Sequence, residues 1–309
     1  MELQNGKQIF ENALKGGYGV GAFNFINLET LKSILTTAEE CKSPVIVQCS
    51  TGAIKYAGVD VLVSMCKSMA KNMTVPVCLN LDHGQTFEDC KMCIDAGFTN
   101  VMIDASHYSY EENIEITKKV VEYAHARGVT VEAELGVLAG VEDEVSASED
   151  DAKFTNPKQA YEFVKATGVD SLAIAIGTSH GTVKFKGEAK LRFDILEEVE
   201  KLLPNFPIVL HGASSIPQDM VALAEKYGAK LKGSCGIPEK MLREACSHNV
   251  CKVNVDSDLR LSFTAGIRQS LTENPENVDI RKYNQVGMGY IKQVVKDKME
   301  NVFGSANRV

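Results

Sequence analysis

Short apolar runs alternate with helical stretches along most of this chain. Each run is rich in valine, isoleucine and leucine, as in PVIVQCS at residues 44–50. The segments between the runs repeat apolar residues every three or four positions, for example Leu31, Ile34 and Leu35, which is the period of a helix that buries one face. Eight strands are predicted, at Tyr18–Phe25, Pro44–Ser50, Val75–His83, Asn100–Ser106, Val129–Gly136, Ser171–His180, Pro207–Gly212 and Val250–Asp258.

The continuous apolar character of these runs predicts a parallel sheet covered by helices on both faces. Eight strand–helix alternations favour closure into a (β/α)8 barrel, the TIM barrel of the α/β class, over an open doubly wound sheet. Such barrels commonly form one domain of about 250 residues or more. We therefore expect residues 1–309 to be a single domain, in which the tail Asp279–Val309 adds a C-terminal helical extension.

One segment, at residues 137–155, breaks this rhythm. It is small, acidic and without a helical or strand period, and it is longer than an ordinary connection. Two interpretations stay open, a solvated surface loop or a mobile lid over a site at the strand ends.

The composition of the chain indicates which binding partners and which cellular compartment to expect. The 309 residues include 33 basic and 41 acidic ones, a net charge of -8, which argues against a general nucleic-acid surface. The first ten residues do not resemble a signal peptide, and no run reaches the roughly 18 apolar residues that would span a membrane. The nine cysteines follow no disulfide framework, so we expect reduced thiols in a cytoplasmic protein.

Polar residues recur at the predicted C-terminal ends of the strands, and in a barrel these ends converge on one face. They include Asn24, Ser50, Asp82, His83, Asp104, Glu134, His180, His211, Asn254 and Asp256. Three histidines from three strands, His83, His180 and His211, form a typical catalytic zinc set. Glu134 and Asp104 are alternative ligands or partners that orient the rings. Asp82 is either a general acid or base or an anchor for the following helix.

Two loops have the composition of anion-binding sites. GTSHGTVK at 177–184 and HGASS at 211–215 place small residues, hydroxyls and a lysine directly after candidate ligand histidines. Backbone amides exposed by small residues can bind phosphate oxygens. Arg260 and Arg281 are candidates for holding a second phosphate.

The motifs LDHG, MIDASH, VEAELG, GTSHG, HGASS and NVDSD, in this order, resemble those of the class II, metal-dependent fructose-bisphosphate aldolases over essentially the whole chain. The resemblance implies zinc-dependent, reversible cleavage of fructose 1,6-bisphosphate to dihydroxyacetone phosphate and glyceraldehyde 3-phosphate, in glycolysis and gluconeogenesis. It implies that His83, His180 and His211 bind the zinc. Asp82 would be the acid/base, and Glu142 in the acidic segment would handle a second proton.

The resemblance also implies the substrate contacts. Those to the ketone-side phosphate would be Gly181, Lys184, Gly212, Ser214 and Ser257, with a monovalent cation, Na⁺ or K⁺, nearby. Those to the dihydroxyacetone part would be Asn24 and Asn254, and those to the aldehyde half Ser50, Asp256, Arg260 and Arg281. Arg281 would reach in from a neighbouring subunit, so a homodimer or homotetramer is expected.

Other functions remain as alternatives. Tagatose-1,6-bisphosphate aldolases share the scaffold and the metal ligands, although Asp256 favours fructose bisphosphate. Ala213 departs from the family's glycine-rich run. A Schiff-base aldolase would need Lys252, which starts roughly 13 Å below the barrel mouth, so a structural role is expected for it. A metal hydrolase or a non-catalytic sugar-phosphate sensor would leave Asp82 or the two phosphate loops unexplained.

Overall fold

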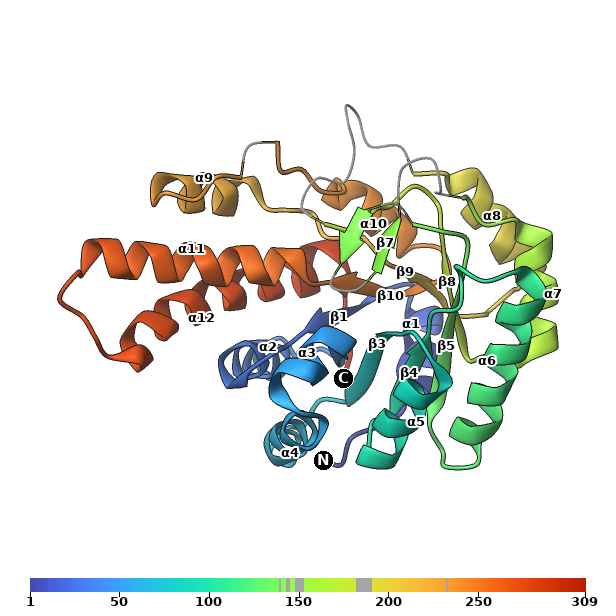
Figure 1. Ribbon diagram of the computed structural model, residues 1–309. Helices are drawn as coiled ribbons and strands as arrows, with labels where there is room; N and C mark the ends of the chain where they lie inside the picture. The colour runs from blue at the N-terminus through green and yellow to red at the C-terminus, as the bar shows by residue number, and fades with distance from the viewer. Residues whose placement is uncertain (139, 143–144, 148–152, 182–190, 232) are drawn as a thin grey trace.

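Eight parallel strands close into a barrel in a computed structural model that describes residues 1–138, 140–142, 145–147, 153–181, 191–231 and 233–309 (Figure 1). The order around the barrel is β1-β10-β9-β8-β5-β4-β3-β2. These strands are β1 (Val20–Asn24), β2 (Val45–Ser50), β3 (Val77–Gly84), β4 (Asn100–Ile103), β5 (Thr130–Leu135), β8 (Ser171–Ile174), β9 (Ile208–Leu210) and β10 (Val250–Val255). The predicted α/β class and TIM-barrel architecture are confirmed.

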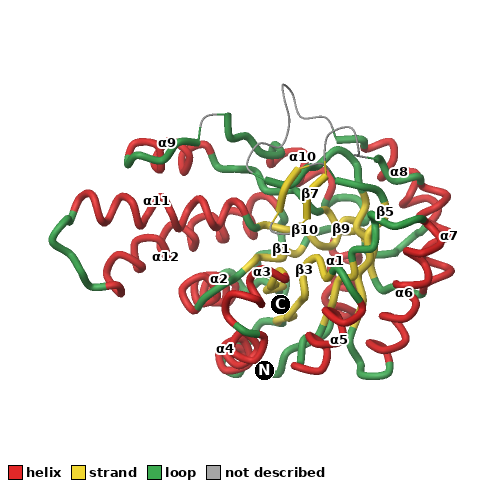
Figure 2. The backbone as a smooth tube through the Cα atoms, in the orientation of Figure 1, coloured by secondary structure: helices red, strands yellow, loops and turns green. Residues whose placement is uncertain are grey.

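Helices surround the strands, as Figure 2 shows in red around yellow. They are α1 (Gly6–Gly16), α2 (Leu28–Glu40), α3 (Thr51–Ala57), α4 (Val59–Ala70), α5 (Phe87–Ala96), α6 (Tyr110–His125), α7 (Pro157–Thr167), α8 (Phe193–Leu202), α9 (Gln218–Lys226), α10 (Glu239–Ala245), α11 (Ser257–Glu273) and α12 (Ile280–Asp297), which continues into a π-helical turn, Lys298–Val302. Several start at a side-chain cap; Thr86 and Ser109, for example, form capping boxes at α5 and α6. Within the described parts of the chain, every helix is too short or too polar to span a membrane.

The apolar core has two parts. The larger part lies between the barrel and its helices, and a smaller one fills the barrel's N-terminal end. There Phe10 of α1 packs with Val20, Ile46 and Cys78 of three strands. Helix α1 was not among the predicted elements. This helix of 11 residues lies before the first strand. Its apolar side closes the N-terminal end of the barrel.

Several predicted strands are shorter in the structure, and the largest difference is at β8. β8 ends at Ile174 and β9 at Leu210, so the expected strand Ser171–His180 was too long by six residues. Ala175 and Ile176 continue the apolar run and are buried, but the chain turns at Gly177, whose φ is +107°. His180 is therefore carried by a loop, while His211 directly follows its strand.

The acidic segment contains some regular structure that its sequence did not predict. Strands β6 (Gly140–Glu142) and β7 (Val145–Ala147) pair as an antiparallel hairpin outside the barrel. Because β6 and β7 form a separate sheet, β5 is followed around the barrel by β8. The lid interpretation of this segment stays a prediction.

The C-terminal extension is confirmed as a helical hairpin. α11 and α12 pack along each other and project from the barrel in Figure 1. The connection between them and the first turn of α12 expose Val278 (90%) and Ile280 (60%). Among the described residues Val278 is the most exposed large apolar side chain, and only Tyr56 lies between it and Ile280.

The partly exposed carboxylate of Glu39 joins α2 to the segment before β3. Glu39 accepts hydrogen bonds from Thr74 Oγ1, from the backbone N–H of Thr74 (2.8 Å) and Val75 (3.4 Å), and from Lys42 Nζ (2.9 Å). Burial alone would raise the pKa of Glu39, but these hydrogen bonds outweigh it and lower the pKa to about 2. The ionised form is therefore the one that stabilises the fold.

We expect Glu39→Gln to lower the free energy of unfolding at neutral pH by about 1–2 kcal/mol. The folded pKa lies below the unfolded value of about 4.3, so the contribution is present above that value and is lost as the pH falls toward 2. Urea unfolding of both proteins from pH 7 to pH 3 measures the difference. Glu40→Gln, at an exposed pair with Lys292, is the control. A difference that stays constant with pH would contradict the assignment.

Candidate active site

The C-terminal ends of the strands bring most of the predicted polar residues into one buried group. Asn24 and Ser50 are the last residues of β1 and β2, and Asn254 is the last but one of β10. Their exposed fractions are 5%, 6% and 7%. Asp82 lies among them, 1% exposed, which makes this end of the barrel the candidate site.

A β-bulge near the end of β3 controls how Asp82 and His83 are aimed. Successive side chains of a regular strand point to opposite faces, so we expected these two on different sides. The register between β3 and β4 shifts between Leu81 and Gly84, and His83 has a φ of +50°. A bulge re-aims a side chain in this way, and both residues end up within the same buried cluster.

The three predicted ligand histidines lie together. The ring centroids of His83 and His180 are 5.0 Å apart, and those of His83 and His211 are 4.6 Å apart, both edge to face. His83 Nε2 and His211 Nδ1 are hydrogen-bonded at 2.9 Å. One ligand atom from each of the three residues fits within a 4.8 Å group.

The outer nitrogens of two of these rings are held by carboxylates. His83 Nδ1–H donates to Asp104 Oδ2 (2.9 Å), and His211 Nε2–H donates to Glu132 Oε1 (2.6 Å). Such partners fix the tautomer of a metal-binding histidine and the direction of its ring. They leave His83 Nε2 and His211 Nδ1 facing each other.

Both carboxylates are themselves fixed. Ser106 Oγ donates to Asp104 (2.7 Å). Lys252 Nζ donates to both oxygens of Glu132 (3.0 and 2.8 Å), and Lys252 and Glu132 are fully buried. The structural role expected for Lys252 agrees with this contact, because its amine is turned to Glu132 below the histidines.

The surroundings of His83 and His211 shift the pKa values of the two imidazoles in opposite directions. Burial alone would lower the pKa of His83, but the hydrogen bond to Asp104 and the charges of nearby carboxylates raise it to about 10. Burial lowers the pKa of His211, and the neighbouring His83 adds to this effect against the hydrogen bond to Glu132. His83 Nε2–H is therefore the donor in its hydrogen bond to His211 Nδ1. A metal ion would replace that proton, because each nitrogen binds metal through its lone pair.

Glu134 completes the cluster. Burial, together with the charge of Asp104, raises its pKa well above the ordinary value. Its Oε2 is 3.5 Å from His211 Nδ1 and 3.9 Å from His83 Nδ1, and no hydrogen bond to it is found among the described residues. A buried oxygen of this kind, beside inward-facing imidazole nitrogens, fits a site for a divalent cation such as zinc.

Asp82 is held by amides from two other strands. Asn24 Nδ2 donates to its Oδ2 (2.8 Å) and Asn254 Nδ2 to its Oδ1 (2.9 Å). Two fixed donors hold the carboxylate in one orientation next to the candidate metal centre. The alternative, an anchor for the next helix, is not supported by these contacts, since Thr86 caps α5.

The two candidate phosphate loops approach each other closely. Gly212 has a φ of +58°, and a Cβ there would lie 2.6 Å from the carbonyl of Ser179. Ser257 Oγ, at the start of α11, donates to the carbonyl of Gly181 (3.5 Å). Ser214, two residues after Gly212, is buried. These predicted contacts therefore share one corner of the site, whereas Lys184 lies outside the described residues.

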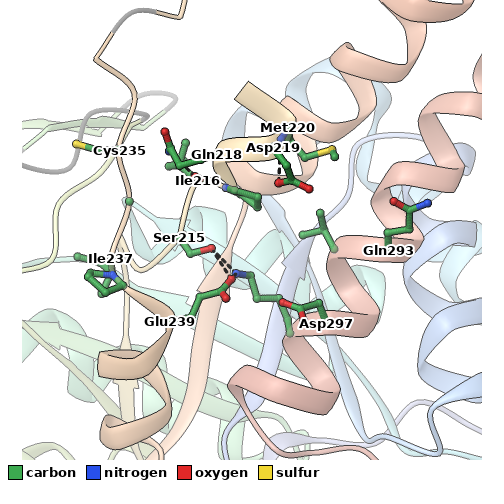
Figure 3. Close-up of a pocket in the computed structure, with 15 residues that line it drawn as sticks. Ser215, Ile216, Gln218, Asp219, Met220, Cys235, Ile237, Glu239, Gln293 and Asp297 are labelled. Carbon is green, nitrogen blue, oxygen red and sulfur yellow. Dashed lines mark hydrogen bonds and ion pairs between the residues drawn. The ribbon is translucent and has the colours of Figure 1, made fainter. Parts of the chain in front are cut away.

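The loop after β9 is held from the side away from the histidines, where Ser215 and Ile216 line a cavity (Figure 3). The volume of this cavity is about 640 Å³. Asp258 accepts from the N–H of Ser215 (3.1 Å) and of Ile216 (2.7 Å). Lys298 Nζ donates to Ser215 Oγ and to Glu239 (2.6 Å). Two hydrogen bonds to backbone N–H groups and one to the Ser215 side chain thus hold the loop that follows His211.

Of the four predicted aldehyde-side residues, Ser50 ends β2, two others lie together, and one lies apart. Asp256 and Arg260 form an ion pair at the start of α11 (2.8 Å). Arg281 begins α12, its side chain is 86% exposed, and it pairs with Asp279 (2.9 Å). It does not join the site of its own chain. The side chain of Glu142 lies outside the described residues, although its backbone belongs to β6.

The sequence analysis did not find the polar residues deeper in the barrel, namely Gln48, Asn80, Asn100 and Thr130. All are buried, and they alternate with apolar residues along their strands. Every second residue of a strand points to the same face. The polar residues at this period of two were therefore the signal that could have identified side chains inside the barrel.

A closed (β/α)8 barrel with a candidate metal centre at its strand ends is the architecture of a metal-dependent barrel enzyme. The chain matches the family model described as fructose-bisphosphate aldolase class-II over residues 4–308. A fructose-bisphosphate aldolase of Helicobacter pylori strain J99 is 50% identical over 99% of this chain and all of its own, and one of Treponema pallidum is 49% identical, over 99% and 97%. The solved YdjI aldolase of Escherichia coli K12 has a TM-score of 0.81 at 30% identity, covering 99% of both chains. The chain belongs to the class II fructose-bisphosphate aldolases, and it is therefore an aldolase, a carbon–carbon lyase.

We expect Asp104→Ala to weaken zinc affinity by about 10- to 100-fold. The variant removes the acceptor of His83 Nδ1–H, so the ring loses its orientation. Competition with a chromophoric chelator at neutral pH measures the affinity. Asp95→Ala, which removes an exposed carboxylate paired with Lys91, is the control. Equal affinity in Asp104→Ala and the parent protein would mean that Asp104 does not orient the ring.

Proposed function

We propose that this chain cleaves fructose 1,6-bisphosphate, reversibly and with zinc, into dihydroxyacetone phosphate and glyceraldehyde 3-phosphate. The observation that carries the proposal is the pairing of two sites. The inward nitrogens of His83 and His211 face each other at 2.9 Å, and Asp82 is held by two amides among the same strand ends. Aldol cleavage needs an electrophile and a base close together.

The zinc would be held by His83, His180 and His211, with Glu134 and Asp104 as alternative ligands. When bound, it supplies an electrophile that polarises the carbonyl of the substrate. Asp82 takes the proton from the hydroxyl on the carbon that becomes the aldehyde. Asn24 and Asn254 keep its carboxylate in place and contact the dihydroxyacetone part. Glu142 handles the second proton at the carbon that has lost the aldehyde.

The substrate's two phosphates define the rest of the site. The ketone-side phosphate is bound by the loop corner described above, with Gly181, Lys184, Gly212, Ser214 and Ser257. The close approach of Gly212 to Ser179 supports this, because it turns backbone of both loops to one place. A monovalent cation, Na⁺ or K⁺, would lie near the same phosphate.

The aldehyde half is bound by Ser50, Asp256 and Arg260. Arg281 completes it from a neighbouring subunit, which requires a homodimer or homotetramer. The exposed position of Arg281 on the projecting hairpin supports this, since an intramolecular role would need it near the barrel. We also propose that residues 1–309 act as one domain in the cytoplasm, in line with nine cysteines present as free thiols.

The direct test is cleavage of fructose 1,6-bisphosphate and, separately, tagatose 1,6-bisphosphate before and after chelation and zinc re-addition. We expect chelation to abolish activity, zinc to restore it, and the fructose substrate to be preferred. Preference for tagatose would keep the mechanism and correct the substrate. Activity that survives thorough chelation would overturn the metal mechanism, and borohydride trapping would then examine Lys252.

We expect Asp82→Ala to bind zinc and substrate as the parent does, while kcat falls by about 10²- to 10⁴-fold. The variant removes the proton acceptor but none of the candidate ligands. Steady-state kinetics, metal analysis and substrate titration together separate these effects. Unchanged turnover would favour a different base, and loss of zinc would show that Asp82 supports the metal instead. Asp95→Ala serves again as the control.

A further inference from the structure

Five polar residues form a continuous row across five neighbouring strands inside the barrel. In the sheet register, Asn24 faces Gln48, Gln48 faces Asn80, Asn80 faces Asn100, and Asn100 faces Thr130. Each is at most 5% exposed. The row begins at the first residues of β5 and β4 and ends at the last residue of β1. Because barrel strands are tilted and staggered, it climbs from the bottom of the barrel to the site.

The row is also a chain of hydrogen bonds. Thr130 Oγ1 donates to Asn100 Oδ1 (2.5 Å), and Asn100 Nδ2 donates to Asn80 Oδ1 (2.6 Å). Asn80 Nδ2 donates to Gln48 Oε1 (3.0 Å), and Gln48 Nε2 donates to Asn24 Oδ1 (2.7 Å). Every member accepts from the residue below it and donates to the residue above it.

The chain of hydrogen bonds ends at a backbone N–H below and at a carboxylate above. At the bottom, Thr130 Oγ1 accepts from the backbone N–H of Gly6 (2.9 Å). Gly6 is the first residue of α1, where an N–H has no partner within the helix. At the top, Asn24 Nδ2 donates to Asp82 Oδ2 (2.8 Å). A carboxylate can only accept, so Asp82 requires Asn24 to donate and thereby fixes the direction from the top. The Thr130 hydroxyl, which accepts from Gly6, is compatible with this direction because its O–H can donate to Asn100.

This direction matters for Asn24. An amide side chain that turns over exchanges its donor for its acceptor. If Asn24 turned over, its carbonyl oxygen would face Asp82, and two acceptors would meet. The amides below prevent this, because turning any one of them breaks two buried hydrogen bonds, at the desolvation cost of the groups left unpaired.

A row of polar side chains is an unusual way to fill the interior of a barrel. The interior of such barrels is mostly filled by bulky branched residues, and burying amides costs free energy unless every group is bonded. Apolar side chains would fill the same space without that requirement. The row therefore has a use beyond filling the barrel.

We propose that Gln48, Asn80, Asn100 and Thr130 are positioning residues, which fix the orientation of Asn24 and through it the carboxylate of Asp82. This inference rests on the proposed function, in which Asp82 moves the proton. It assigns a part in turnover to residues at the bottom of the barrel, on the side opposite to the substrate.

The test compares Thr130→Val with Thr130→Ser. Valine has nearly the shape of threonine but cannot accept from Gly6 or donate to Asn100, whereas serine can do both. We expect Thr130→Val to lower kcat for fructose 1,6-bisphosphate about 3- to 10-fold, the scale of one hydrogen bond. KM and zinc content should stay unchanged, and Thr130→Ser should restore kcat.

A second variant tests the same chain of hydrogen bonds in case Thr130→Val does not fold. Asn100→Leu breaks the same chain one link higher, so we expect a similar loss of kcat. The double variant Thr130→Val/Asn100→Leu should lose no more than the larger single loss, because residues that act as one chain are not additive. Thermal unfolding of all four proteins records any loss of stability separately.

Two results would overturn the inference. One is equal kcat in Thr130→Val and Thr130→Ser, and the other is multiplication of the losses in the double variant. If the parent shows no zinc-dependent cleavage, the proposed function fails instead. If the parent cleaves and Asp82→Ala does not, while the row variants are fully active, only the positioning role fails.

Discussion

The strict alternation of side chains along a strand is the constraint on which this site depends. Only every second residue points into a barrel, so eight short strands offer few inward positions at their C-terminal ends. The bulge in β3 relaxes that limit at one place, where His83 takes a φ of +50°. Two consecutive residues, Asp82 and His83, thereby face one candidate site, and the carboxylate of Asp82 lies close enough to the His83 ring to raise its pKa.

Burying so many ionisable groups is possible because each charge has a partner in a fixed order. Lys252 holds Glu132, Glu132 holds His211, and His211 is bonded to His83. Burial alone would raise the pKa of Glu132, but Lys252 and His211 outweigh it and lower that pKa to about 2. The lysine that might suggest Schiff-base chemistry thus neutralises the carboxylate behind a candidate zinc ligand, and the three-histidine site depends on it.

The fold and the strand-end residues could be predicted from the sequence, because a period of two or 3.6 and a polar residue after an apolar run are local signals. The position of His180 could not, since the apolar run continues through Ile176 after the strand has ended. The inward aim of both Asp82 and His83 depends on a bulge, which no residue type marks. The pairing of Gln48 with Asn80 depends on the register between strands, which is a property of the closed barrel.

Helix α1 links these levels of the structure. Its apolar side closes the N-terminal end of the barrel through Phe10, and the N–H of Gly6 at its start is the fixed donor below Thr130. A helix end normally leaves such donors to water or a cap, and here a strand residue inside the barrel takes one of them. The same element that completes the packing therefore also holds the lower end of the amide row. In this barrel, the packing of the bottom and the orientation of Asp82 at the top are parts of one hydrogen-bonded arrangement.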